Sequence, residues 1–363
     1  MNRLDSRNLL LTRSFTMGLF ESDTILVTGG AGFIGSALVC ELNDRGYDNI
    51  IVADFLGNGD KFLNLVTLKF ADYMEADALL ELVRGNDPRL KKVTHIFHMG
   101  ACSSTTERNA AYLIKNNYEY SKILANFANQ RNIRFVYASS AATYGDGSNG
   151  MSDSDNSNFS LRPLNMYAYS KHLFDLYVAR NCLRVYGIKY FNVFGPNEYH
   201  KGEMRSMVLK AYESIIATGK VNLFKSYNPS YKDGEQMRDF LWVRDAVAMT
   251  IFLAEIPEVV NGEPTNGVYN SGSGVASPWN ALVSAVFKAM GLQPNIEYIE
   301  MPGALKCKYQ HYTRGDISKL RKIGYSGKIT PLEDAVGNYV KNYLMSGMKR
   351  LEPQNETKVL NAP

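Results

Sequence analysis

The chain lacks the features that define several large protein classes. It has four cysteines in 363 residues, and their scattered positions match no metal-ligand spacing. No apolar run approaches the ~18 residues that a membrane span needs, and the net charge of +4 comes without a long lysine or arginine run. We therefore expect no metal, no membrane span and no nucleic-acid partner, but free thiols in a reducing cytoplasm, with Cys40 and Cys102 in or beside the core.

The composition of the chain is that of an ordinary globular protein, and its N-terminal segment is unusual. Hydrophobic residues make up 45% and charged residues 21% of the chain, which is typical of a soluble enzyme with one large domain or two. Residues 1–16 carry three arginines and one acid. This segment is a targeting peptide or a spurious extension, and we favour the second because Met17 precedes the first predicted strand. We exclude residues 1–22 from the fold and expect a flexible tail at 348–363.

Apolar runs and helical patterns alternate along the front half of the chain. This alternation is typical of βαβ units, and right-handed crossovers then give an α/β fold with a doubly wound parallel sheet. We expect a dinucleotide-binding domain at 23–195, completed by about 238–275, and a smaller α/β substrate domain at 196–237 and 276–347. The predicted strands are 24–28, 50–54, 68–71, 96–100, 135–139, 188–192 and 240–243. The predicted helices are 34–45, 77–84, 111–131, 167–180, 204–218 and 278–290.

A glycine motif follows the first predicted strand. Gly29, Gly32 and Gly35 permit a tight turn, close backbone approach to a pyrophosphate, and close packing of the following helix on the strand. The N-terminus of that helix favours a phosphate through its free N–H groups and its dipole. Asp54 ends the next apolar run, where a carboxylate would face an adenosine ribose. The motif therefore predicts a dinucleotide site.

Tyr167 and Lys171 share one face of a predicted helix because they lie at positions i and i+4. A free tyrosine has a pKa of about 10 and is a poor base. A nearby ammonium would lower that pKa and make acid–base catalysis feasible. Taken alone, the pair is equally consistent with an exposed helix face.

Ser139 and Ser140 end a predicted strand, at the edge of the sheet where ligands bind in open α/β folds. A serine here could hydrogen-bond the oxygen of a reacting alcohol. It could also merely satisfy neighbouring backbone groups.

In this order, the glycine motif, the serine and the Tyr-x-x-x-Lys pair resemble the extended short-chain dehydrogenase/reductases. The resemblance sharpens to the ADP-L-glycero-D-manno-heptose 6-epimerase family and runs from about residue 24 to about residue 344. Ala-Cys-Ser-Ser-Thr-Thr-Glu at 101–107 and His-Lys-Gly at 200–202 are its most specific parts. The runs that carry it are 100–107, 138–145, 163–171, 190–202 and 306–313.

The resemblance implies a Rossmann-type fold and an isomerase that inverts C6″ of an ADP-heptose. A bound nicotinamide coenzyme takes a hydride from the substrate and returns it to the other face. It implies NADP, with NAD possible, and a cytoplasmic homo-oligomer, a pentamer, in lipopolysaccharide core biosynthesis. Tyr167 and Lys201 would serve as proton partners on opposite sides, assisted by Ser140 and Lys171. Read without the resemblance, Lys201 could equally bind a phosphate or a sugar.

Two further groups of residues carry over from the family by position. The coenzyme-binding group is Gly29, Gly32, Phe33, Ile34, Gly35, Asp54, Phe55, Lys61, Met99, Gly100, Ala101, Cys102, Ser103, Asn116, Lys171 and Val193. The substrate-binding group is Asn192, Lys201, Glu203, Lys210, Phe224, Arg238 and Tyr309. Arg238 suits a diphosphate because its guanidinium can bind phosphate oxygens in pairs.

Departures from the family pattern keep other functions open. Glu203, Lys210 and Ala76 replace residues found in some members, which bears on sugar contact and on the choice between NAD and NADP. Ala141 and Ala142 stand where related dehydratases carry an acidic pair, which argues against dehydration. The remaining alternatives are a UDP-hexose 4-epimerase, which shares every catalytic residue but Lys201, and a non-enzymatic cofactor-sensing protein.

Overall fold

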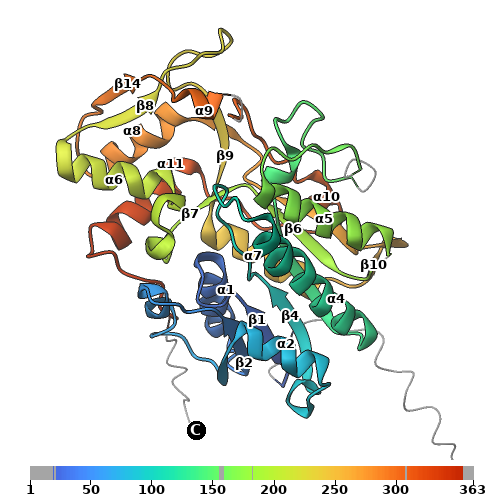
Figure 1. The fold of residues 1–363 in the computed structure, drawn as a ribbon. Coiled ribbons are helices and arrows are strands. Elements are labelled where there is room, and N and C mark those ends of the chain that lie inside the picture. Colours follow the sequence, from blue (N-terminus) through green and yellow to red (C-terminus); the bar gives the residue numbers. More distant parts are fainter. Residues whose placement is uncertain (1–18, 20–21, 155–158, 182, 307–308, 355–363) are drawn as a thin grey trace, which may run out of the picture.

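A seven-stranded parallel sheet forms the centre of the molecule (Figure 1). The structure is a computed structural model, and it describes residues 19, 22–154, 159–181, 183–306 and 309–354. The strand order is β12-β6-β5-β4-β1-β2-β3, which places the first strand in the middle. The strands are β1 (Thr24–Thr28), β2 (Ile50–Asp54), β3 (Asp72–Glu75), β4 (Val93–His98), β5 (Arg134–Ser140), β6 (Tyr186–Tyr190) and β12 (Gly267–Ser271).

Helices cover both faces of this sheet. Along β1, Ile25 and Val27 belong to one buried cluster and Leu26 to another, because successive side chains of a strand point to opposite faces. The first cluster includes residues of α1 (Phe33–Asp44) and α7 (Val243–Glu255). The second includes residues of α2 (Ala76–Arg84), α4 (Tyr120–Gln130) and α5 (Met166–Arg180). The predicted doubly wound α/β fold is confirmed.

A second group of elements lies beside the carboxyl ends of the central strands (Figure 1). Its core joins the first cluster, so one apolar interior runs through both groups. Its strands are β7 (Asn192–Phe194), β9 (Met237–Trp242) and β13 (Ala276–Pro278) in one sheet, and β8 (Val221–Phe224) and β14 (Ile296–Ile299) in another. Its helices are α6 (Met207–Thr218), α8 (Trp279–Ala289), α9 (Gly303–Lys306) and α11 (Leu332–Tyr339). The short strands β10 (Val259–Val260) and β11 (Glu263–Pro264) pair with each other just before β12, and α10 (Ser318–Lys322) packs against β12. The division into two domains stays a prediction.

Several element boundaries differ from the predictions. The third strand lies at 72–75 instead of 68–71, because this edge strand carries mostly exposed residues and lacks an apolar run. Strand β12, which completes the central sheet, and strands β8 and β14 were not predicted. The predicted helix 111–131 is three pieces: α3 (Ala110–Leu113), a π-helix at Ile114–Glu119, and α4. Within the described part of the chain, every helix falls short of the length and apolar character that a membrane crossing requires.

Parts of both chain ends pack on the body of the molecule. Leu351 is only 1% exposed, and its N–H donates to Asn197 Oδ1 at 2.9 Å. Leu351 therefore anchors the first part of the predicted tail at 348–363, and the flexibility of that tail stays a prediction. Leu19 is also buried, and its carbonyl accepts a hydrogen bond from Tyr47 Oη at 2.9 Å, so the excluded segment 1–22 reaches too far. Residues 1–16 and 355–363 lie outside the described residues.

Two of the four cysteines can be placed. Cys40 and Cys102 are free thiols, buried and half-buried respectively. Burial raises the pKa of the Cys40 thiol to about 12, which makes it unreactive. Cys182 and Cys307 lie outside the described residues.

Candidate active site

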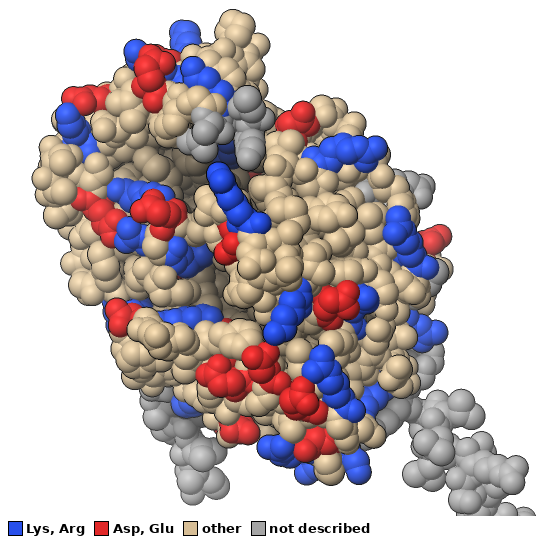
Figure 2. Space-filling view, in the orientation of Figure 1, with Lys and Arg blue, Asp and Glu red and all other residues tan. Residues whose placement is uncertain are grey.

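A cavity of about 830 Å³ opens at the carboxyl ends of the central strands, and Figure 2 shows the hollow on this face with lysine and arginine side chains along its margin. Its walls come from both groups of elements, so it lies where ligands bind in open α/β folds. The predicted residues that line it are Gly29, Gly32, Phe33, Ile34, Gly35, Asp54, Lys61, Met99, Gly100, Ala101, Cys102, Ser103, Ser140, Tyr167, Lys171, Asn192, Val193 and Lys201.

The glycine-rich turn after β1 forms the floor of the cavity. Gly29 has φ of +69°, and a Cβ atom there would lie 2.5 Å from the nitrogen of Gly100. A Cβ atom at Gly35 would overlap the carbonyl oxygen of Gly29. Helix α1 begins at Phe33 without a side-chain cap on its first N–H groups, and its first three residues, Phe33, Ile34 and Gly35, line the cavity. This turn fits the pyrophosphate of a dinucleotide.

Asp54 links the glycine-rich turn to Lys61. Its carboxylate accepts hydrogen bonds from the nitrogens of Ala31 at 2.9 Å and Phe55 at 2.7 Å, and it pairs with Lys61 Nζ at 2.5 Å. Asp54 and Lys61 both line the cavity. Phe55 does not, because its side chain is 45% exposed on the outer surface.

The loop after β4 is held by an asparagine that the sequence reasoning missed. Asn117 Oδ1 accepts from the nitrogen of Cys102 at 2.8 Å, and its Nδ2 donates to the Cys102 carbonyl at 2.9 Å. The predicted Asn116 does not line the cavity, because its amide donates to the Tyr112 carbonyl of its own helix. A π-helical turn changes which side chains face inward. The adjacent asparagines at 116 and 117 were the available signal.

Helix α5 presents Tyr167 and Lys171 to the cavity. Asn165 caps the helix by accepting a hydrogen bond from the nitrogen of Ala168 at 2.8 Å. Lys171 Nζ donates to the carbonyl of Ala138 at 2.8 Å, and burial lowers its pKa to about 8. Burial also raises the pKa of Tyr167, partly offset by a hydrogen bond with Ser140. Burial is the largest cause of this shift and Lys171 is not among its causes, so the expectation that Lys171 lowers the Tyr167 pKa stays a prediction.

A buried ion pair lies behind this helix face. Asp175 lies four residues after Lys171, and its carboxylate accepts hydrogen bonds from Tyr137 Oη at 2.9 Å and Ser139 Oγ at 2.8 Å. Lys189 Nζ lies 3.4 Å from the same carboxylate. The charge of Asp175 opposes the burial that lowers the Lys171 pKa, and so favours the ammonium form. The sequence reasoning missed both residues because nothing local marks them as partners.

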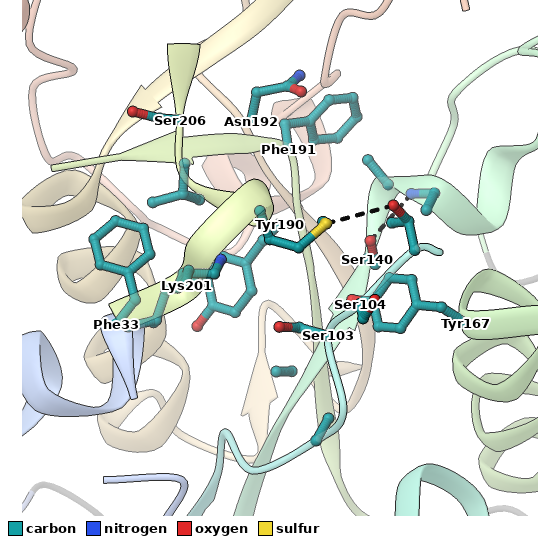
Figure 3. Close-up of a pocket in the computed structure, with 18 of the residues that line it drawn as sticks. Phe33, Ser103, Ser104, Ser140, Tyr167, Tyr190, Phe191, Asn192, Lys201 and Ser206 are labelled. Atoms are coloured by element: carbon teal, nitrogen blue, oxygen red, sulfur yellow. Dashed lines mark hydrogen bonds between the residues drawn. The ribbon is translucent and has the colours of Figure 1, made fainter. Parts of the chain in front are cut away.

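Lys201 lies on the opposite side of the cavity from Tyr167, with Ser103, Ser104 and Tyr190 between them (Figure 3). It belongs to a short 3₁₀ segment, η6 (Tyr199–Met204), and its Nζ lies 5.4 Å from the centre of the Phe33 ring. Burial lowers the pKa of Lys201, and the nearby Glu198 carboxylate partly opposes this.

The remaining predicted substrate residues lie outside the cavity. Lys210 Nζ donates to the Glu203 carbonyl at 2.6 Å and lies 3.3 Å from its carboxylate, so these two side chains bind each other on the surface. Phe224, at the end of β8, does not line the cavity either. None of these three residues lines the cavity in this structure, so their role in binding substrate stays a prediction.

Arg238 and Tyr309 lie one side chain behind the cavity wall. The Arg238 guanidinium lies over the rings of Trp279 and Tyr309, at 5.6 and 4.9 Å. Trp279 lines the cavity and donates from Nε1 to Tyr309 Oη at 3.0 Å. Tyr309 itself lines a second cavity of about 770 Å³. Neither Arg238 nor Tyr309 lines the first cavity in this structure, and Trp279 is a wall residue that the sequence reasoning missed.

Comparisons with known proteins agree with this geometry. Residues 25–272 match the model of the NAD dependent epimerase/dehydratase family. An ADP-L-glycero-D-manno-heptose-6-epimerase from Nitratidesulfovibrio vulgaris (strain Hildenborough) is 49% identical over 322 residues, which cover 88% of this chain and 97% of the relative.

Solved structures extend the comparison to the fold. The crystal structure of the Helicobacter pylori ADP-L-glycero-D-manno-heptose-6-epimerase superposes with a TM-score of 0.71 at 29% identity, covering 89% of this chain and 96% of the other. A UDP-N-acetylglucosamine 4-epimerase from Methanobrevibacter ruminantium has a TM-score of 0.75 at 24% identity, covering 91% and 100%, and shows a shared fold alone. The chain therefore belongs to the NAD dependent epimerase/dehydratase family.

Proposed function

We propose that the protein inverts C6″ of ADP-D-glycero-D-manno-heptose to give the L-glycero epimer. One observation carries the proposal: Tyr167 and Lys201 face one cavity from opposite sides (Figure 3). An epimerase must handle the same oxygen in two orientations, and a proton partner on each side meets that need. The 49% identity to an ADP-L-glycero-D-manno-heptose-6-epimerase supports the choice of substrate.

A nicotinamide coenzyme bound against the glycine-rich turn would supply the hydride acceptor and donor for C6″. The protein residues handle the proton and the position of the sugar. During oxidation, the residue that faces the C6″ hydroxyl takes its proton, and the resulting ketone turns in the cavity. During reduction, the residue on the other side returns a proton to the oxygen. Ser140, which lines the cavity, can hydrogen-bond this oxygen in one orientation.

The environments of the two residues suit an acid and a base. Burial raises the pKa of Tyr167, so its phenol keeps its proton and can donate it. Burial lowers the pKa of Lys201, which increases the fraction of neutral amine that can accept a proton. The two environments push these pKa values apart, with that of the phenol raised and that of the amine lowered, which suits one residue as the acid and the other as the base.

We also propose that the coenzyme is NADP, with NAD as the weaker ligand. The ion pair between Asp54 and Lys61 supports this choice, because Lys61 offsets the negative charge that would repel a ribose phosphate. Titration of coenzyme-free protein with NADP and NAD tests it. Tighter binding of NAD would reverse the assignment.

The resemblance to the ADP-L-glycero-D-manno-heptose 6-epimerase family supports a cytoplasmic homo-oligomer, and we propose a pentamer. Light scattering on the purified protein measures the mass of the assembly directly. A mass other than five times the 40.7 kDa chain would reject the pentamer.

The test of the reaction is incubation with ADP-D-glycero-D-manno-heptose, followed by NMR of the two C6″ epimers. Substrate labelled with deuterium at C6″ should give product that retains the label there, without added coenzyme. Solvent hydrogen at C6″ would instead indicate proton abstraction from carbon and would reject the proposed chemistry. UDP-glucose is tested separately as an alternative substrate. Conversion of UDP-glucose but not of the ADP-heptose would identify a 4-epimerase.

A further inference from the structure

Two buried asparagines connect residues 197–202, called the Lys201 turn here, to the glycine-rich turn after β1. Asn64 is 2% exposed, and its Nδ2 donates to the carbonyls of Ala31 and Asn197, each at 3.0 Å. Asn197 is fully buried and donates from its own Nδ2 to Ser36 Oγ on α1 at 2.9 Å. Both bridges therefore run between the start of α1 and the residues just before Lys201.

The C-terminal segment 349–351 completes this network. Arg350 Nε donates to Asn64 Oδ1 at 3.1 Å, and the nitrogen of Leu351 donates to Asn197 Oδ1 at 2.9 Å. Tyr199 Oη, in the Lys201 turn, donates to the carbonyl of Lys349 at 2.8 Å. The side-chain oxygen of each asparagine thus accepts a hydrogen bond from the C-terminal segment. The side-chain nitrogen of Asn64 donates to both turns, and that of Asn197 donates to α1.

The backbone at Asn197 shows why this site needs such support. Asn197 has φ of +76°, a left-handed conformation that costs free energy for residues with a side chain, although asparagine tolerates it better than most. The turn also contains Gly202 with φ of +53°. The strained conformation of Asn197 persists only when its neighbours fix it, and Asn64 and the C-terminal segment supply those contacts.

We propose that Asn64 is a positioning residue that sets the place of Lys201 relative to the glycine-rich turn, with Arg350 holding Asn64 in its orientation. This inference rests on the proposed function, since it assigns the network a purpose in proton transfer by Lys201. Lys201 Nζ already lies against Phe33, the first residue of α1, so movement of the turn changes the distance between Lys201 and the coenzyme-binding side of the cavity (Figure 3).

The experiment compares Asn64→Ala with Asn43→Ala. Asn43 is a matched control, because its amide also accepts one hydrogen bond, from the nitrogen of Lys69, and donates two, to the carbonyls of Tyr47 and Lys69, but it does not line the cavity. The first readout is acetylation of Lys201 by acetic anhydride in the enzyme as purified, measured by mass spectrometry against the exposed Lys92. The second is the separate measurement of kcat and KM for the ADP-heptose.

In Asn64→Ala we expect the acetylation ratio to change by at least about threefold and kcat to fall about tenfold, with KM within about threefold, since misplacing a catalytic group affects the transition state more than binding. Asn43→Ala should leave all three values near those of the parent. An unchanged acetylation ratio in Asn64→Ala overturns the proposal. If Lys201→Met is slow, a changed ratio in Asn64→Ala with a normal kcat also overturns it.

The labelling readout separates this inference from the proposed function. A changed ratio in Asn64→Ala together with full activity of Lys201→Met supports the positioning of Lys201 and rejects its catalytic role. If Asn64→Ala does not fold, Arg350→Met is the second variant. It removes the hydrogen bond to Asn64 Oδ1 and the guanidinium that lies 5.5 Å from the centre of the Tyr199 ring, at a half-buried residue. It should change the same two readouts in the same direction by a smaller factor, and no change in either would overturn the proposal.

Discussion

The two sides of the cavity are built in different ways. Tyr167 lies near the start of a 15-residue helix that Asn165 caps, and Lys171 follows one turn later on the same face. Lys201 lies in a six-residue 3₁₀ segment in which Tyr199 binds the carbonyl of Lys349. Just before this segment, Asn197 binds residues 64 and 351. Regular secondary structure positions the first residue through local bonds, whereas contacts between distant parts of the chain position the second.

This comparison predicts that the Tyr167 side can lose its chemistry without losing its shape. Tyr167→Phe should lower kcat by at least about a hundredfold, as loss of a general acid–base group does, because only the phenolic oxygen is removed. The melting temperature should stay within about 2 °C of the parent, since surface and cavity substitutions of this kind change stability little. Turnover near the parent rate would remove Tyr167 from the mechanism.

The matching change on the other side is Lys201→Met. We expect kcat to fall by at least about thirtyfold for both epimers, with affinity for the ADP-sugar within a few fold, because a proton partner acts in the transition state. The measurement is kcat and KM in both directions. Weak substrate binding with a normal kcat would instead identify Lys201 as a phosphate ligand.

The same difference explains what the sequence could predict. The glycine motif and the Tyr-x-x-x-Lys pair are local patterns, so their spacing alone predicted the turn after β1 and the shared helix face of Tyr167 and Lys171. Asn117 was missed in favour of Asn116 because the π-helical turn at 114–119 is not visible in an apolar pattern. Strand β3 was misplaced because an exposed edge strand carries little apolar signal.

Residues from distant segments were the harder part of the site. Glu203 and Lys210 were assigned by resemblance, and the structure shows their side chains bound to each other. The contacts of Asn64 with residues 31, 197 and 350 depend on tertiary packing, which no local spacing encodes. The packing of Leu351, inside the predicted flexible tail, depends on tertiary contacts in the same way.

Removal of residues 349–363 tests the dependence of the Lys201 side on distant contacts. We expect kcat to fall about tenfold and the melting temperature to drop by a few degrees, because burial of Leu351 contributes about 2 kcal/mol and its loss frees the Lys201 turn. Bound coenzyme, measured by absorbance of the purified protein, should remain. An enzyme with parental kcat would show that the turn is stable without this segment.

A pH profile sharpens the account of the Tyr167 side. Burial lowers the Lys171 pKa to about 8, so the ammonium form dominates below this pH and the neutral amine above it. If the ammonium supports Tyr167, kcat should be about half its plateau near pH 8 and fall further as the pH rises. A plateau that continues unchanged to pH 10 would show that the charge of Lys171 is not needed.

The smallest effect is expected at the other chain end. A protein that starts at Met17 keeps Leu19, whose carbonyl binds Tyr47 Oη, and should show unchanged melting temperature and activity. By contrast, Leu19→Ala should lower the melting temperature by a few degrees, because the side chain is buried. Loss of soluble protein on removal of residues 1–16 would show that they pack on the body.

The hydrogen bond between Asn64 and Arg350 joins residues 286 positions apart. During synthesis, the glycine-rich turn, the Tyr167 helix and even Lys201 leave the ribosome well before residue 350 does. The dinucleotide site can therefore form on a nascent chain whose Lys201 turn still lacks its last contacts. Catalytic competence then arrives as the final step of folding, and a chain stopped short of residue 350 should bind coenzyme before it can turn over substrate efficiently.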